Sequence, residues 1–273
     1  MLLSIKGVPE LVKIIVLIKD IPDLTEMKID PATRRPLLEH AKRRISDVDK
    51  RALEAAIHLK EKNGGEVLTL SLGDDRTKTT ILEALAMGAD ASHIVNDKAL
   101  LGLDTLATST VLASALNKLE PFDMILCGEM TLDTLSSQVG PRLAELLNLP
   151  QVIYVKRLEI NGRTLRAERD LGSVDEVVEV DLPAVVSVIR EVNEPRIPSL
   201  MNIMKAKKKP IVELNAQSLG LSVENIRALS SIEILRVEAP IVERKHVILK
   251  GETLEEAAQK LARAILAEGL LEA

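Results

Sequence analysis

The sequence predicts an α/β protein: a mostly parallel open sheet with flanking helices, followed by an antiparallel extension and a C-terminal helical arm. Three observations lead to this fold class. Between residues 13 and 147, continuous apolar runs alternate with segments of helical spacing, which is typical of βαβ units with right-handed crossovers. From residue 152, strand-like runs follow one another through turns such as Asn161-Gly162, a strong hairpin signal. The chain then closes with an amphipathic segment at 253–270.

In the alternating part, strands are expected where β-branched and aliphatic residues run together, because a strand covered on both faces shows no polar alternation. These runs are 13–19, 66–72, 93–96 and 122–127. Helices are expected between and after them, at 46–62, 77–87, 104–119 and 140–147. Ser46 or Asp47 is a suitable N-cap for the first helix, Gly64 and Gly88 end the first two helices, and Pro150 stops the fourth.

The four strand-like runs of the second part are expected to extend the parallel sheet as antiparallel strands. They span 152–160, 163–169, 174–181 and 184–188. Farther on, a capped helix is expected at 222–230 and a strand at 232–237. The terminal helix begins with the capping-box pattern Thr253-Leu-Glu-Glu256, and it can pack on its own domain or on another subunit. Its apolar side consists of Leu254, Ala257, Leu261, Ala264, Ile265 and Leu270.

Composition and charge narrow the classes of function. The chain is 46% hydrophobic and 28% charged, as in globular proteins, and its net charge of −5 argues against nucleic acid as the main partner. Cys127 is the single cysteine, which excludes an internal disulfide and suits a reducing compartment. The apolar run 11–18 is broken by Lys13 and lacks a cleavage region, and no run approaches membrane-spanning length. A cytoplasmic location without membrane insertion is therefore expected.

Residues 193–209, which we call the recognition segment, form the most unusual stretch. Pro195 and Pro198 take the backbone out of regular structure. An apolar set with the spacing of one helical face follows, namely Leu200, Met201, Ile203 and Met204, and then a basic tail of Lys205, Lys207, Lys208 and Lys209. A rigid turn, an apolar anchor and a basic end suit a surface that docks onto a partner. A core-packed short helix with a solvated lysine end is the plainer alternative.

The recognition segment also carries a family resemblance. Asn193-Glu-Pro-Arg, Ser199-Leu and Ile203-Met-Lys-Ala-Lys-Lys-Lys resemble the recognition-loop signature of the electron transfer flavoprotein β subunit. The resemblance runs from about residue 12 to 221 and is clearest at 52–62, 84–90, 128–141 and 183–209. It implies a Rossmann-like variant similar to the adenine-nucleotide α-hydrolases. It also implies a nucleotide-binding domain over 1–215 and a C-terminal arm over 216–273 that contacts an α subunit.

A ligand is expected beyond the carboxyl ends of the parallel strands, where connections diverge. One such end leads into residues 128–139, which we call the crevice loop. This loop is rich in hydroxyl and amide side chains and precedes a helix whose free N–H groups would suit a phosphate. Taken alone, Ser136 and Ser137 are equally explained as ordinary helix caps. The loop matches neither a Walker loop nor a Gly-x-Gly-x-x-Gly fingerprint.

The resemblance makes this site specific, because the family wraps its nucleotide with the matching segments. The crevice loop is implied throughout: Gly128, Glu129, Met130, Thr131, Leu132, Asp133, Thr134, Leu135, Ser136, Ser137, Gln138 and Val139. The other implied contacts are Leu17, Ser46, Asp47, Val48, Asp49, Leu72, Asp104, Thr105 and Thr108. The chain departs from the family pattern at Ser46-Asp47, where the family has Asn-Pro.

The nucleotide itself is left open between two cofactors. Simple members of the family hold AMP in the β subunit, and the main FAD is shared with the α subunit. Bifurcating members place a second FAD in the β site, and the run Leu103-Asp-Thr-Leu-Ala-Thr-Ser109 resembles their pattern. Against a second FAD, Asp133-Thr-Leu-Ser136 lacks one carboxylate and one glycine of the usual phosphate loop. Asp104 and Thr105 are also explained as a plain N-cap pair. Weighed together, these resemblances to the two kinds of member favour a second FAD over AMP by a small margin.

The resemblance implies an electron carrier rather than a hydrolase. Dehydrogenases would be the donors, and a quinone reductase or a ferredoxin-type protein the acceptor, with NADH-linked activity if the protein bifurcates electrons. Leu200 would be the docking anchor, flanked by Glu194, Arg196 and Met201. No catalytic residues and no metal site are expected, because the histidines at 40, 58, 93 and 246 are scattered.

Two other classes stay open as alternatives. An ATP pyrophosphatase or related hydrolase would need a glycine-rich phosphate loop after the first strand, where residues 18–23 contain no glycine. A stress-type nucleotide-binding module that acts alone would not explain the recognition segment and the C-terminal arm.

Overall fold

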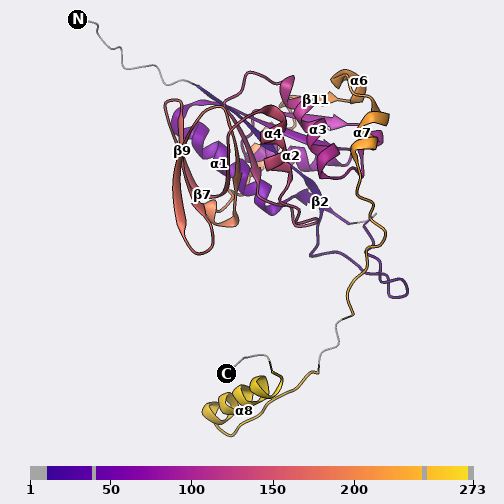
Figure 1. Ribbon diagram of the computed structural model, residues 1–273, viewed down its shortest axis with the longest axis vertical. Helices are drawn as coiled ribbons and strands as arrows, with labels where there is room; N and C mark the ends of the chain where they lie inside the picture. Colours follow the sequence, from indigo (N-terminus) through magenta and orange to yellow (C-terminus); the bar gives the residue numbers. More distant parts are fainter. Residues whose placement is uncertain (1–10, 39–40, 242–244, 270–273) are drawn as a thin grey trace, which may run out of the picture.

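A nine-stranded sheet with helices on both faces forms the body of the protein, and one helix lies apart from it (Figure 1). The structure is a computed structural model that describes residues 11–38, 41–241 and 245–269. The strand order is β11-β5-β4-β1-β6-β10-β7-β8-β9. The predicted α/β class is therefore confirmed, including the mostly parallel sheet and the C-terminal helix.

The first seven strands of this order pair in parallel. They are β11 (Ile211–Leu214), β5 (Ala91–Asn96), β4 (Gly65–Gly73), β1 (Val12–Leu17), β6 (Met124–Gly128), β10 (Ala184–Val188) and β7 (Gln151–Asn161). From β1 the chain builds β4 and β5 on one side, and then returns to place β6 on the other. The carboxyl ends of β1 and β6 thus flank the topological switch point of the sheet, where open α/β sheets bind ligands.

Two helical layers cover the sheet, and alternate residues of each strand face one layer or the other. In β1, Ile14 and Val16 join one core, and Ile15 and Leu17 join the other. The first core includes residues of α1 (Asp47–Asn63), α2 (Thr77–Met87) and α5 (Leu200–Ala206). The second includes residues of α3 (Thr105–Asn117), α4 (Val139–Leu147), α6 (Ala216–Leu219) and α7 (Val223–Leu229), with the 3₁₀ turn η1 (Lys98–Leu100).

The antiparallel extension is smaller than predicted. In the described part of the main sheet, antiparallel pairing begins at β7, which pairs with β8 (Thr164–Asp170), and β8 in turn pairs with β9 (Asp175–Asp181) as a meander. The prediction was wrong for β10, which lies between β6 and β7 and pairs with both in parallel. The reason is visible in its burial, because all five residues of β10 are buried, as a strand covered on both faces requires.

A small second sheet was not predicted. The strands β2 (Asp20–Pro22) and β3 (Arg43–Ile45) pair antiparallel and bring the chain from the end of β1 to the start of α1. Arg43 donates from Nε to Asp20 Oδ2 at 2.9 Å across this pair. As a result, the N-terminus of α1 lies beside the carboxyl end of β1.

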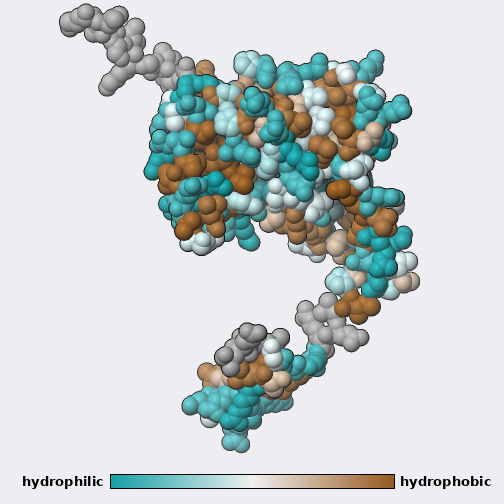
Figure 2. Space-filling model, in the orientation of Figure 1, coloured by the Kyte–Doolittle hydropathy of each residue, from teal (hydrophilic) through white to brown (hydrophobic). Residues whose placement is uncertain are grey.

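Residues 230–241, the described part of the chain directly after α7, form no strand, so the predicted strand at 232–237 is wrong. Ile234 and Leu235 are 74% and 86% exposed, so no neighbouring sheet stabilises an extended pairing. Apolar side chains are visible along this connection in Figure 2. α6 and α7 pack on the body, and Ser230 and Ser231 are still hydrogen-bonded to Asp104, so the segment leaves α3 only after Ser231. The division into domains at residue 216 stays a prediction.

The last helix, α8 (Leu254–Ala267), lies away from the body in Figure 1. Thr253 caps it by accepting from the N–H of Glu256, as predicted, but the Glu256 carboxylate accepts from Glu252 N at 2.8 Å instead of closing the box on Thr253. Leu254 is 90% exposed. The predicted position Leu270 lies outside the described residues. Among the helices of the described chain, none is both long and apolar enough to span a membrane.

Candidate functional site

A buried carboxylate connects the two strand ends at the switch point. Asp49, in the first turn of α1, is 4% exposed and accepts from Lys19 N at 2.9 Å and from Gly128 N at 3.0 Å. One side chain thus joins the end of β1, the end of β6 and the start of α1. Gly128 allows this close approach, since a Cβ there would lie 2.8 Å from Asp49 Oδ1 and 2.9 Å from the Asp49 nitrogen.

Burial raises the pKa of Asp49 to about 7, from an ordinary value of 3.8. The two backbone N–H donors and the charge of Lys19 oppose this rise, while the nearby charge of Asp133 adds to it. The same carboxylate helps burial to raise the pKa of the Cys127 thiol well above its usual range, so this thiol stays protonated at neutral pH. Cys127 is therefore a core residue and no nucleophile.

The Lys19 side chain fastens the first half of the crevice loop. Its ammonium group lies 2.8 Å from Asp133 Oδ2 and 3.4 Å from the hydroxyls of Thr131 and Thr134. The two hydroxyls are 3.1 Å apart, and the N–H of Leu135 donates to the carbonyl of Thr131 at 2.8 Å. The loop therefore folds over the end of β1 as a compact turn.

A second tie holds the other end of the loop. The Gln138 side-chain oxygen accepts from Thr105 Oγ1 at 2.6 Å and from Arg142 at 3.0 Å, which links α3 to the start of α4. Leu135 and Ser137 have φ values of 50° and 52°, so the loop bends through two left-handed residues before the helix. Within the described chain, Gln138 makes no side-chain cap on α4, which leaves the first N–H groups of this helix available.

Both carboxylate oxygens of Asp104, in contrast, accept hydrogen bonds that stabilise the fold. Its carboxylate caps α3 by accepting from Ala107 N at 2.9 Å, and it accepts from Ser231 N at 2.9 Å. These backbone donors, the one at Ala107 first, hold the pKa of Asp104 below its ordinary value. Its neighbour Thr108 is half-buried on the same helix.

Ser46, the N-cap of α1, is completely buried, and its hydroxyl has no hydrogen-bond partner among the described residues. Asp47 forms an ion pair with Arg44, and Val48 is buried behind them. Such an orphaned buried hydroxyl, next to the switch point, fits a site in which a ligand supplies the missing partner.

The structure thus brings the predicted site residues together in part. The crevice loop, Asp49 and Thr105 meet around the switch point, and Ser46, Asp47 and Val48 lie at the adjoining start of α1. Leu17 and Leu72 contribute to the core on the α3 side, with Leu17 6% exposed and Leu72 half-buried. Within the loop, burial raises the pKa of Glu129, and the charge of Glu191 adds to this rise. The assignment of all these residues to a ligand stays a prediction.

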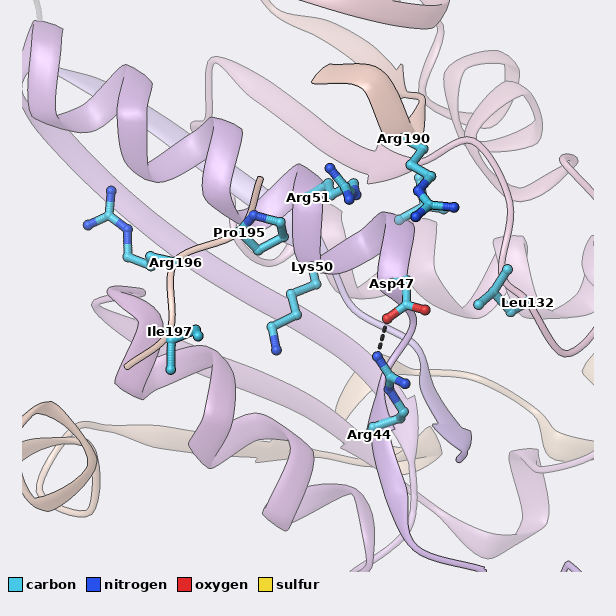
Figure 3. Close-up of a pocket in the computed structure, with 10 residues that line it drawn as sticks. Arg44, Asp47, Lys50, Arg51, Leu132, Arg190, Pro195, Arg196 and Ile197 are labelled. Atoms are coloured by element: carbon cyan, nitrogen blue, oxygen red, sulfur yellow. Dashed lines mark hydrogen bonds and ion pairs between the residues drawn. The ribbon is translucent and has the colours of Figure 1, made fainter. Parts of the chain in front are cut away.

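A groove of about 360 Å³ opens beside this site (Figure 3). It runs from Leu132 of the crevice loop, past the start of α1, to the recognition segment at Pro195–Ile197. Figure 3 shows the basic side chains of Arg44, Arg51 and Arg190 around the carboxylate of Asp47. Arg190 belongs to the 3₁₀ turn η2 (Arg190–Val192) that precedes the recognition segment.

The recognition segment is fixed to α1 by charged groups. Arg196 donates from Nε to the Glu54 carboxylate at 3.0 Å, and its two terminal nitrogens reach Glu61 at 2.7 and 3.0 Å. These carboxylates, with Glu61 the larger influence, raise the pKa of Arg196. Glu194 lies 3.2 Å from Arg51 but is itself 88% exposed. Asn193 donates to the carbonyl of Arg51 at 3.0 Å.

Beyond this anchored part, α5 presents its apolar residues to solvent. Ser199 caps the helix by accepting from Asn202 N at 3.2 Å. Leu200 is 82% exposed and Met201 64% exposed. At the other end, Lys209 donates to the carbonyls of Leu85 and Ala89 at 2.9 and 2.5 Å. A rigidly held helix with an exposed apolar start is suited to docking.

Comparison with known proteins shows the family of the chain. The family described as "Electron transfer flavoprotein domain" matches residues 36–219. The chain belongs to the β subunits of the electron transfer flavoprotein family. It is 38% identical over 254 residues to the "Electron transfer flavoprotein subunit beta" of Thermoanaerobacterium thermosaccharolyticum, covering 92% of this chain and 97% of that relative. It is 38% identical over 236 residues to the protein of the same name from Bacillus subtilis, covering 86% and 91%.

A further relative is the "Caffeyl-CoA reductase-Etf complex subunit CarD" of Acetobacterium woodii, which is 34% identical over 251 residues and covers 91% of this chain and 96% of its own length. As a β subunit of this family, the chain takes part in electron transfer, works with flavin and pairs with an α subunit. The matched residues 36–219 include the crevice loop and the recognition segment, whereas α8 lies beyond them.

Several residues of the site were not singled out from the sequence. Lys19 was only noted as part of a strand end, and Arg44, Arg51 and Arg190 were given no role. The signal for Lys19 was its position directly after a buried strand, because polar residues at the carboxyl ends of parallel strands face the crevice. In the described chain no cluster of three or more metal-binding side chains is found. His40 lies outside the described residues.

Proposed function

We propose that this β subunit holds an adenine nucleotide under the crevice loop and presents α5 to its electron-transfer partners. Dehydrogenases are the proposed donors, and a quinone reductase or a ferredoxin-type protein is the proposed acceptor. The protein would work in the cytoplasm, in agreement with its single, buried and unpaired cysteine. The C-terminal segment with α8 is proposed to reach the α subunit as an arm.

The exposed apolar start of α5 is the observation that carries the docking role. A leucine that is 82% exposed gains apolar burial only when another molecule covers it. Its backbone is preorganised by the Arg196 ion pairs before the helix and by Lys209 after it. Preorganisation lowers the entropy cost of binding, so the segment suits repeated, transient encounters with electron-transfer partners.

The nucleotide role rests on the chemistry around the switch point. The buried Ser46 hydroxyl lacks a partner in the described chain, the start of α4 has free N–H groups, and the Lys19 ammonium lies at the loop. Hydroxyl, amide and cationic donors of this kind fit a phosphate and ribose. An adenine nucleotide therefore fits the residues present, although Asp104 is committed to capping α3.

Between AMP and a second FAD, we propose FAD. The groove between Leu132 and Pro195 adjoins the crevice loop and offers space for a ligand longer than a mononucleotide. Its arginines would favour the pyrophosphate of a dinucleotide. A bound flavin supplies reversible electron transfer, while the residues of this chain bind it, orient it and limit its access to water.

The test is a substitution at the anchor, measured in the complex with the α subunit. Leu200→Ala should slow electron acceptance from a dehydrogenase at least tenfold, because interface anchors of this kind contribute roughly 2 kcal/mol or more. The amount of bound nucleotide should be unchanged. Unchanged electron transfer rates would refute the docking role of α5.

A further inference from the structure

Asp49 occupies an unusual position for a carboxylate. Its two oxygens accept one N–H each from the ends of the two strands that flank the switch point, at 2.9 Å from Lys19 and 3.0 Å from Gly128. Each oxygen therefore fixes a different strand, and α1 is fixed with them. In a sheet of this topology the ligand lies directly beyond these two ends.

The same side chain also determines where the crevice loop begins and where it is held. Gly128 is the first residue of the loop, and its N–H is the donor to Asp49. Lys19, whose backbone N–H is the second donor, carries the ammonium group that binds Asp133 and the loop threonines. A change in the protonation of Asp49 would therefore affect the crevice loop both through Gly128 and through Lys19.

We propose that Asp49 is the positioning residue of the crevice loop, and that an adenine nucleotide binding there is coupled to proton uptake by this carboxyl group. The proposal rests on the proposed function, because it needs a phosphate-bearing ligand above the strand ends. Asp49 would not contact the reacting atoms of a flavin. It would act through Gly128 and Lys19.

The charges around Asp49 give the direction of the coupling. Lys19 faces it from the end of β1, Asp133 from the crevice loop and the neutral Cys127 thiol from β6. With its pKa at about 7, the carboxyl group is partly protonated at neutral pH in the protein without nucleotide. An anionic phosphate would add a second negative charge nearby and favour the neutral carboxyl group further. Binding would therefore take up a proton, and affinity would fall as the pH rises through about 7.

The experiment measures AMP binding by calorimetry at pH 6, 7 and 8, on the complex of the full chain with its α subunit after removal of bound nucleotide. Two buffers with different ionisation heats give the number of protons taken up. AMP changes its own protonation in this range, so Asp49→Asn is the reference for the pH slope: it does not titrate, but its NH2 group cannot accept an N–H, so one of the two backbone hydrogen bonds from Lys19 and Gly128 is lost. The affinity of the wild type should fall about tenfold more than that of the variant between pH 6 and 8.

Identical pH profiles for the two proteins, with equal proton uptake, would overturn the role of Asp49 and leave the nucleotide site intact. If the wild type binds no AMP at any pH, the same titration is made with FAD: equal pH profiles of the wild type and the variant would overturn the role of Asp49, and binding of neither nucleotide would contradict the proposed function. Because the variant could fail to fold, infrared difference spectra of the wild type provide a second test. Adding AMP at pH 7 should increase the carboxylic acid C=O band, and no increase would overturn the proposal.

Discussion

Replacing Arg196 by alanine tests how the recognition segment is held. The guanidinium group of Arg196 connects the segment to two carboxylates of α1, one buried and one exposed. Glu54 is 2% exposed and Glu61 is 53% exposed. The backbone N–H of Arg196 also donates to Glu54 at 3.0 Å. The substitution removes the guanidinium from both carboxylates but keeps this backbone donor.

The contact of Arg196 with the buried Glu54 determines most of the expected loss in the free energy of unfolding. Leaving a buried charge without its partner costs roughly 3–5 kcal/mol. Here His58 Nε2 remains 2.8 Å from Glu54, and Arg196 is itself 33% exposed, so part of the charge stays compensated and screened. We therefore expect Arg196→Ala to lower the free energy of unfolding by about 2–3 kcal/mol. The exposed pair with Glu61 should contribute less than about 1 kcal/mol.

Urea unfolding at pH 7 is the assay, and Glu61→Gln is the matched control because it removes only the exposed half of the contact. Arg196→Ala should lose at least 1 kcal/mol more than Glu61→Gln. Equal and small losses for the two variants would refute the reasoning, since they would mean that Glu54 does not depend on Arg196.

Three further predictions concern docking, the switch point and pH. Leu200→Ala should slow electron acceptance without changing the melting temperature. Val177→Ala, at an exposed position of β9, is the control and should change neither the electron-transfer rate nor the melting temperature. A lower melting temperature for Leu200→Ala would show that Leu200 belongs to the core. Gly128→Ala should cost about 1–3 kcal/mol in urea unfolding, because its Cβ would meet backbone atoms of Val48 and Asp49 at 2.9 Å. Gly140→Ala should cost less, because its Cβ would meet only side-chain atoms, Cys127 Sγ at 3.1 Å and Ser187 Cβ at 3.8 Å; the reverse order would contradict the geometry. Asp49 has a raised pKa, so its contribution to stability is complete below about pH 4 and is lost as the pH rises through about 7, by up to roughly 4 kcal/mol. Unfolding free energies of Asp49→Asn between pH 4 and 8 should lack this loss, and a slope equal to that of the wild type would contradict it.

Local signals in the sequence were sufficient for most elements of the fold. The helix Thr77–Met87 was predicted with its correct bounds, because an apolar face and Gly88 mark it. Gly64 likewise ends α1. The position of β10 was missed, since residues 184–188 are apolar whether they pair with the preceding strands or are inserted beside β6. The edge strand β11 also escaped, because only its pairing with β5 makes it a strand.

The site could be predicted to a smaller extent. The composition of the crevice loop and its place after a buried strand drew attention to it, but only the family resemblance assigned it to a nucleotide, and that assignment stays a prediction. The side-chain contacts that hold the loop in place could not be predicted, because residues such as Lys19 and Asp133 are 114 residues apart in sequence. The same holds for Arg196 and Glu54, which are separated by 142 residues. No local pattern marks such a pair, and the chemistry of Asp49 depends on burial that only the folded chain provides.

The nucleotide content of the heterodimer tests the central claim most directly. The chain would be co-purified with its α subunit, the complex denatured, and the released FAD and AMP counted by chromatography. We expect two FAD and no AMP per heterodimer. One FAD with one AMP would keep the nucleotide site and refute the second flavin. One FAD without AMP, or no nucleotide at all, would contradict the claim that residues 128–139 hold a nucleotide.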